Sequence, residues 1–126
     1  MMEAMSAEAR PGALGLADPQ VCDLSGVKGA WLAYPYIGFL AVNRARLWRH
    51  RPRTLGVIAR GDHLGGERQA LALYAGLAAS GLPVETWVVD GTHAFDEPEA
   101  TVPMRYDPAL TETALGRFRD FLEALA

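Results

Sequence analysis

Residues 84–95, Val-Glu-Thr-Trp-Val-Val-Asp-Gly-Thr-His-Ala-Phe, restrict the fold more than any other stretch of this chain. The largely apolar first half predicts a strand at 84–90 that is buried on both faces, as the strands of parallel sheets are. Open parallel sheets bind their ligands at the carboxyl ends of the strands. His93 follows this strand directly, so it falls where chemistry is expected. The alternative is a polar residue that simply closes a strand.

A buried strand that runs into an aromatic loop is expected at residues 29–37, and a second strand is expected at residues 54–60. Residues 67–80 are rich in helix formers, and Gly81 directly after them is typical of the end of a helix. Strands that alternate with helices of this length predict an α/β fold with about three parallel strands and crossover helices.

A terminal helix is expected to begin at Asp107, a plausible N-cap, with Pro108 at its first helical position. Its apolar residues recur every three or four positions, which predicts one buried stripe of an amphipathic helix. The stripe would consist of Leu110, Ala114, Phe118, Leu122 and Leu125.

The composition narrows the classes of protein. With 126 residues, 50% of them hydrophobic, the chain can bury one core, so a single domain is expected. A net charge of −3 argues against a general nucleic-acid-binding protein. The single cysteine, Cys22, excludes a disulfide within the chain and favours a reducing, cytoplasmic location.

No membrane, metal or cofactor partner is expected from the sequence. Residues 1–10 lack the apolar segment of a secretory signal. The longest apolar stretch, residues 29–42, contains a proline and is shorter than the roughly 20 residues that a membrane span needs. The three histidines and the cysteine are scattered without metal-ligand spacing, and no glycine-rich phosphate loop occurs.

Two polar turns follow the second and third expected strands. Asp62 stands in the first turn and His93 in the second, 31 positions later, which leaves room for one helix and one strand between them. A carboxylate that accepts from one imidazole nitrogen fixes the tautomer and leaves the other nitrogen as a base. The alternatives are that Asp62 caps the following helix or holds the turn, and that His63 is the functional histidine.

Residues 81–98 and 105–126 closely resemble the C-terminal part of the dienelactone hydrolase family of α/β-hydrolases, and their His-x-Phe element is fairly specific. Residues 26–35 and 56–66 also resemble segments of that family. The family's acid turn is usually Gly-x-x-Asp, and Ala59 stands here in place of the glycine. The resemblance implies an ester or lactone hydrolase for small-molecule substrates, in which His93 is the base and Asp62 the acid that orients it.

The nucleophile of that family, a cysteine or serine in a Gly-x-Cys/Ser-x-Gly turn, has no match in this chain. The family layout places it near Ser6, but Glu8 occupies the position of the second glycine, and too few residues precede Ser6 for a strand. Ser6 is therefore a nucleophile candidate by position alone, against an ordinary serine of a disordered terminus. Cys22 lacks flanking glycines, and Ser25 is explained as a turn or cap residue.

The resemblance covers residues 26–126, and residues 1–25 are expected to be an irregular or helical remnant before it. We therefore expect a partial α/β-hydrolase domain: a fragment, the product of a late start codon, or a domain completed by another subunit. Its open sheet edge is expected to favour self-association. The alternative function is a non-catalytic remnant or interaction module that keeps the C-terminal half of the fold.

Two other groups of side chains have both a functional and a structural interpretation. The arginine-rich segment 42–53 is either a patch for anionic substrates or an exposed loop or helix. Aromatic residues near the end of the first expected strand either line a pocket or belong to the core. They are Trp31, Tyr34, Tyr36 and Phe39.

Overall fold

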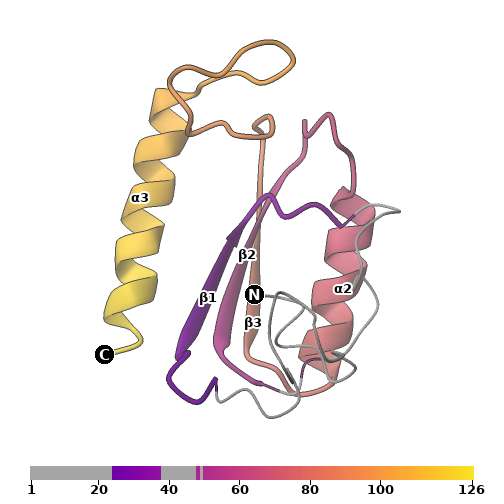
Figure 1. The fold of residues 1–126 in the computed structure, drawn as a ribbon, viewed down its shortest axis with the longest axis vertical. Coiled ribbons are helices and arrows are strands. Elements are labelled where there is room, and N and C mark those ends of the chain that lie inside the picture. Colours follow the sequence, from indigo (N-terminus) through magenta and orange to yellow (C-terminus); the bar gives the residue numbers. More distant parts are fainter. Residues whose placement is uncertain (1–23, 38–47, 49) are drawn as a thin grey trace, which may run out of the picture.

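The computed structural model describes residues 24–37, 48 and 50–126, and within these ranges it contains three strands and two helices (Figure 1). The element order is strand, strand, helix, strand, helix, as expected from the sequence. The elements are β1 (Gly29–Ala33), β2 (Arg53–Ala59), α2 (Glu67–Ala79), β3 (Val84–Val89) and α3 (Pro108–Glu123).

The three strands form one parallel sheet in the order β1-β2-β3. Leu32 of β1 pairs with Gly56 of β2, and Ala59 at the end of β2 pairs with Val89 at the end of β3. All three carboxyl ends therefore lie along one edge of the sheet. This arrangement confirms the predicted α/β fold with a parallel sheet.

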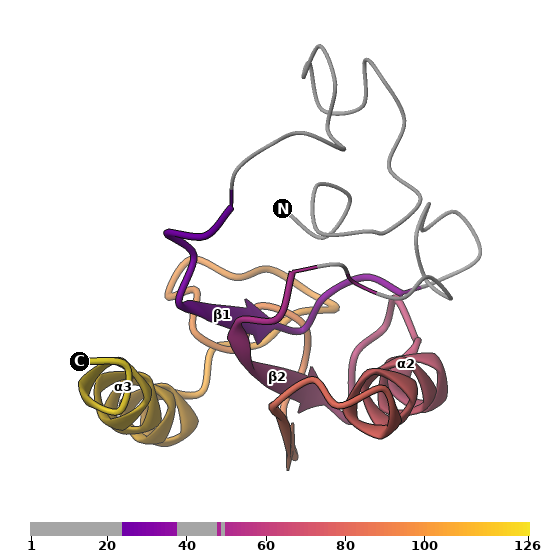
Figure 2. The same ribbon diagram turned by 90° about the horizontal axis from the view of Figure 1, so that it is seen from below.

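The two helices cover opposite faces of the sheet (Figures 1 and 2). The side chains of β2 alternate between two apolar clusters: Ile58 packs with residues of α2, whereas Leu55 and Val57 pack with Phe121 of α3. The buried side chains of α2 recur at helical spacing, which places them on one face. They are Ala70, Leu73, Tyr74 and Leu77. None of the described helices is long and apolar enough to cross a membrane.

The helix ends follow from the residues that the sequence places there. Asp107 accepts a hydrogen bond from the backbone N–H of Leu110 at 2.9 Å, and Pro108 begins α3. After α2, Gly81 has a φ of 88°, and the next N–H, that of Leu82, donates to the carbonyl of Leu77 at 3.1 Å. This hydrogen-bond pattern ends a helix and requires the left-handed conformation that glycine adopts easily. Both predicted ends are confirmed.

Two details differ from the prediction. Glu85 and Thr86 of β3 are exposed, because β3 lies at the edge of the described sheet; the strand buried on both faces is β2. In α3, Phe121 is buried, whereas two members of the expected stripe, Phe118 and Leu122, are 38% and 49% exposed. A helix advances about 3.6 residues per turn, so position 121 returns to the side of Leu110, and position 122 lies beyond it.

In the central strand β2, the ring of Tyr74 occupies the space that a side chain at Gly56 would need. A Cβ atom at Gly56 would lie 2.4 Å from Cε2 of Tyr74, and Tyr74 is only 1% exposed, so its ring has no room to move. We expect Gly56→Ala to lower the free energy of unfolding by about 1–3 kcal/mol through overpacking. Urea unfolding followed by circular dichroism measures this loss.

Gly76 of α2 serves as the control, since nothing lies within 4 Å of a Cβ atom there. Gly76→Ala is expected to raise the free energy of unfolding by about 0.5–1 kcal/mol, because alanine is the better helix former. Equal unfolding midpoints for the two variants would contradict the packing of Tyr74 against β2.

Candidate active site

The two turns that follow β2 and β3 bring a carboxylate and an imidazole together. Oδ2 of Asp62 lies 2.8 Å from Nδ1 of His93, although the residues are 31 positions apart. Asp62 comes from the turn after β2 and His93 from the turn after β3. The predicted contact between these side chains is confirmed, whereas their catalytic role stays a prediction.

Glycines allow the two turns to approach so closely. The N–H of Gly61 donates to the carbonyl oxygen of Gly91 at 2.9 Å, which continues the pairing of β2 and β3 beyond the strands. A Cβ atom at Gly61 would lie 2.9 Å from that same oxygen, and one at Gly91 would lie 2.7 Å from Leu110. A larger residue at Gly61 would push the two turns apart, and with them Asp62 and His93, whereas one at Gly91 would clash with α3.

The carboxylate of Asp62 is held on both of its oxygens. Oδ1 accepts from the backbone N–H of Leu64 at 2.8 Å, which leaves Oδ2 for His93. The N-cap of α2 is Gly66, not Asp62, so the alternative that Asp62 caps this helix is wrong. The other alternative, that Asp62 holds the turn, is compatible with its contact to His93. Oδ1 accepts the hydrogen bond within the turn, and Oδ2 faces His93.

The contact with Asp62 determines which nitrogen of His93 can act as a base. A carboxylate only accepts hydrogen bonds, so Nδ1 of the neutral ring must carry the proton, and Nε2 keeps its lone pair. The side chain of His93 is 23% exposed and that of Asp62 is 12% exposed. The pair is therefore partly shielded from water, which strengthens its electrostatic interaction, and the imidazole remains accessible.

The neighbouring histidine does not take this position. His63 is exposed, and the structure records no hydrogen bond or ion pair between its ring and a carboxylate in the described residues. Its ring lies edge-on to that of His93, with the centroids 5.9 Å apart. The structure therefore favours His93 over His63 as the partner of Asp62.

The aromatic residues near the end of β1 have different environments. Tyr34 contacts His93 edge-on, with ring centroids 4.7 Å apart, and its hydroxyl donates to Oδ1 of Asp96 at 2.7 Å. Trp31 instead contacts Phe118 of α3. Sequence reasoning did not single out Asp96. The only signal available was its position three residues after His93.

Several candidates from the sequence lie outside the described residues or far from the pair. Ser6, Cys22 and Phe39 belong to the first group, as do the arginines at 44, 46 and 49. Arg51 donates to the carbonyl oxygen of Ser80 at the end of α2, and Arg53 to that of Ala124 after α3. These two arginines of the segment 42–53 therefore bind helix ends and not the Asp62–His93 pair.

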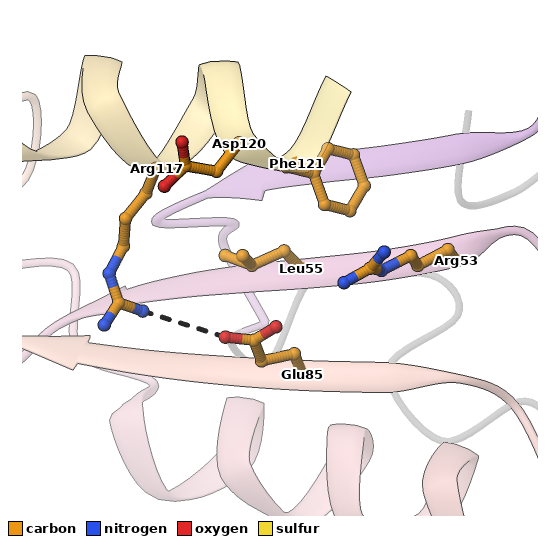
Figure 3. A pocket seen from close by; sticks show the side chains of 6 residues that line it. All are labelled: Arg53, Leu55, Glu85, Arg117, Asp120 and Phe121. Atoms are coloured by element: carbon orange, nitrogen blue, oxygen red, sulfur yellow. Dashed lines mark ion pairs between the residues drawn. The ribbon is translucent and has the colours of Figure 1, made fainter. Parts of the chain in front are cut away.

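A separate hollow of about 250 Å³ lies at the opposite ends of the strands, between the sheet and α3 (Figure 3). Its charged side chains are two cations and two anions, so their charges cancel. Arg117 approaches Glu85 to 3.7 Å. The lining residues are Arg53, Leu55, Glu85, Arg117, Asp120 and Phe121. The hollow contains neither member of the pair.

Fold and site together define a parallel α/β protein with an aspartate–histidine pair at the carboxyl edge of its sheet. Within residues 24–37, 48 and 50–126, no cluster of histidine, cysteine or acidic side chains has the arrangement of a metal site. No protein-family model, curated protein or solved structure matches the chain.

Proposed function

We propose that Asp62 and His93 are the acid and the general base of an ester or lactone hydrolase. The observation that carries the proposal is the 2.8 Å contact between Oδ2 of Asp62 and Nδ1 of His93 at the tips of adjacent parallel strands. Such a pair is what hydrolases with a serine or cysteine nucleophile need. The resemblance of residues 26–126 to the dienelactone hydrolase family supports the same reaction.

In this reaction, Nε2 of His93 takes the proton from the hydroxyl or thiol of the nucleophile as that group attacks the carbonyl carbon of the ester. The C–O bond to the leaving group then breaks, and the alkoxide receives the proton from Nε2. The acyl group is now bonded to the nucleophile. Water gives a proton to Nε2 as its oxygen attacks the acyl carbon, the bond between that carbon and the nucleophile breaks, and Nε2 returns the proton to the nucleophile as the acid is released. The carboxylate of Asp62 keeps the ring in the required tautomer and stabilises the imidazolium in between.

In this proposal Asp62 is the acid and His93 is the base, and the nucleophile lies outside the described residues. Ser6 remains the candidate by position and lies outside the described residues. The single cysteine, Cys22, which lies there too, supports a cytoplasmic site of action, because reducing conditions keep a thiol free. Small esters and lactones are the proposed substrates.

The experiment begins with the reading frame upstream of Met1. We use "extended chain" for the product that includes any in-frame residues found there. A strand followed by Gly-x-Ser/Cys-x-Gly, together with hydrolysis of p-nitrophenyl acetate or dihydrocoumarin by the extended chain, is the expected result. An extended chain that binds neither substrate and hydrolyses neither would contradict the proposal.

The second candidate function is a non-catalytic interaction module. Two observations favour it: the 126 residues contain no Gly-x-Ser/Cys-x-Gly turn, and α3 has an apolar row on its surface. In this row Leu115 is 53% exposed, Phe118 38% and Leu122 49%. An upstream frame without a nucleophile turn, and a chain without hydrolase activity, would support this function instead.

A further inference from the structure

Tyr34 adopts an unusual backbone conformation immediately after β1. Its φ is 34°, in the left-handed region that bulky residues rarely adopt. Its backbone N–H still donates to the carbonyl oxygen of Val57 at 2.7 Å, so the residue is fixed to β2 on its main chain. A strained residue of this kind persists only where its surroundings hold it.

The side chain of Tyr34 is held at its far end by the turn that carries His93. Its hydroxyl donates to Oδ1 of Asp96 at 2.7 Å. Burial, followed by the hydrogen bond and the negative charge of Asp96, raises the pKa of the Tyr34 hydroxyl. A tyrosine hydroxyl is protonated at neutral pH, and this shift keeps it a donor to the carboxylate at alkaline pH as well.

Between these two fixed points, the ring of Tyr34 lies against His93. The two rings meet edge-on at 63°, with centroids 4.7 Å apart, and Tyr34 meets Phe95 at 5.7 Å in the same manner. Phe95 is 2% exposed, and its carbonyl oxygen accepts from the N–H of Asp107 at 2.8 Å. The turn is thus anchored after His93, whereas among the described residues the imidazole itself is held by Asp62 and neighbouring rings.

We propose that Tyr34 is a positioning residue that keeps the imidazole of His93 against Asp62, with its own ring held in place by Asp96. Its consequence for catalysis rests on the proposed hydrolase function. The geometry of the ring does not rest on it and can be tested without a substrate. An ordinary core aromatic would contribute to stability but would not influence the tautomer of His93.

The test is the tautomer of His93, read from the ring ¹⁵N chemical shifts of the labelled protein at a pH where the ring is neutral. His93→Gln assigns the signals. In the unaltered protein we expect the proton on Nδ1. Tyr34→Ala is expected to lower the ratio of the Nδ1–H to the Nε2–H form about tenfold and Tyr34→Phe about threefold, since an aromatic pair and a charged hydrogen bond have such energies.

Tyr36→Ala is the matched control, because Tyr36 is 45% exposed and lies two positions further along the chain. Its ratio should equal that of the unaltered protein. A ratio within twofold of the unaltered protein in folded Tyr34→Ala would overturn the inference. If Tyr34→Ala does not fold, Asp96→Asn replaces it in the test, because Asp96 is exposed and its substitution disturbs no core packing. The ratio of the Nδ1–H to the Nε2–H form should then fall about threefold. A ratio within twofold of the unaltered protein would again overturn the inference.

Asp62→Asn separates this inference from the proposed function. If Asp62→Asn leaves the tautomer ratio unchanged, the Asp62–His93 pair itself does not exist in solution, and both proposals fail. If Asp62→Asn changes the ratio and Tyr34→Ala does not, only the role of Tyr34 is wrong.

Discussion

Asparagine in place of Asp62 is expected to lower the kcat of the extended chain for p-nitrophenyl acetate by about 10⁴, with little change in fold, as the same change does in other triads. The reason is the direction of one hydrogen bond. The side-chain oxygen of residue 62 that accepts from the N–H of Leu64 would keep that role, so the new amide would face Nδ1 of His93. An amide N–H donates, so Nδ1 must accept, and the ring proton moves to Nε2. The base is then blocked.

Asp90→Asn is the matched control for this variant. Asp90 lies at the tip of β3 and pairs with Arg60 on the surface, away from Nδ1 of His93. Its loss should leave kcat within about threefold, because exposed ion pairs contribute little. Equal losses in both variants would show that general weakening of the sheet tip, and not the tautomer, limits the rate.

The 126-residue chain by itself is expected to hydrolyse p-nitrophenyl acetate at a negligible rate, about 10⁴ or more below the extended chain. An oriented histidine can still activate water, but the developing oxyanion would lack the backbone donors that accompany a nucleophile turn. Removing one such donor costs about 10²–10³ in turnover, and removing the nucleophile costs most of the remainder. The measurement is the initial rate of p-nitrophenolate release by the purified chain.

Ser6 gives this prediction its sharpest test. An enzyme-like rate in the 126-residue chain, abolished by Ser6→Ala, would show that the nucleophile lies in the first residues without a glycine turn. The same rate, retained in Ser6→Ala and lost in Cys22→Ala, would assign the role to the cysteine.

The fold was predictable because local signals and the hydrophobic pattern agree. Gly81 and Asp107 mark helix ends in the sequence and form those ends in the structure. The exposure of individual residues was less predictable. The pattern around residue 87 is typical of a buried strand, yet β3 lies at an edge of the described sheet. The order of the strands in a sheet cannot be predicted from the sequence of one strand. Tertiary arrangement, not propensity, decides which strand is central.

The candidate site was predictable where topology alone brings residues together. Adjacent parallel strands place the turns of Asp62 and His93 side by side, so their contact followed from the strand assignment. The contact of Tyr34 with Asp96 did not, because it depends on a left-handed backbone at Tyr34 and on the path of the turn after His93. No periodic pattern signals such a conformation in a residue other than glycine.

The most direct measurement of the central claim compares His93→Ala with His63→Ala in the extended chain. The two histidine rings lie close together, and that of His93 is the one with a nitrogen 2.8 Å from the carboxylate of Asp62. Loss of the base should lower kcat/KM for p-nitrophenyl acetate by about 10⁴–10⁶ in His93→Ala, whereas His63→Ala should keep it within about threefold. Retention of most of the activity in His93→Ala, or its loss in His63→Ala alone, would contradict the assignment of His93 as the base.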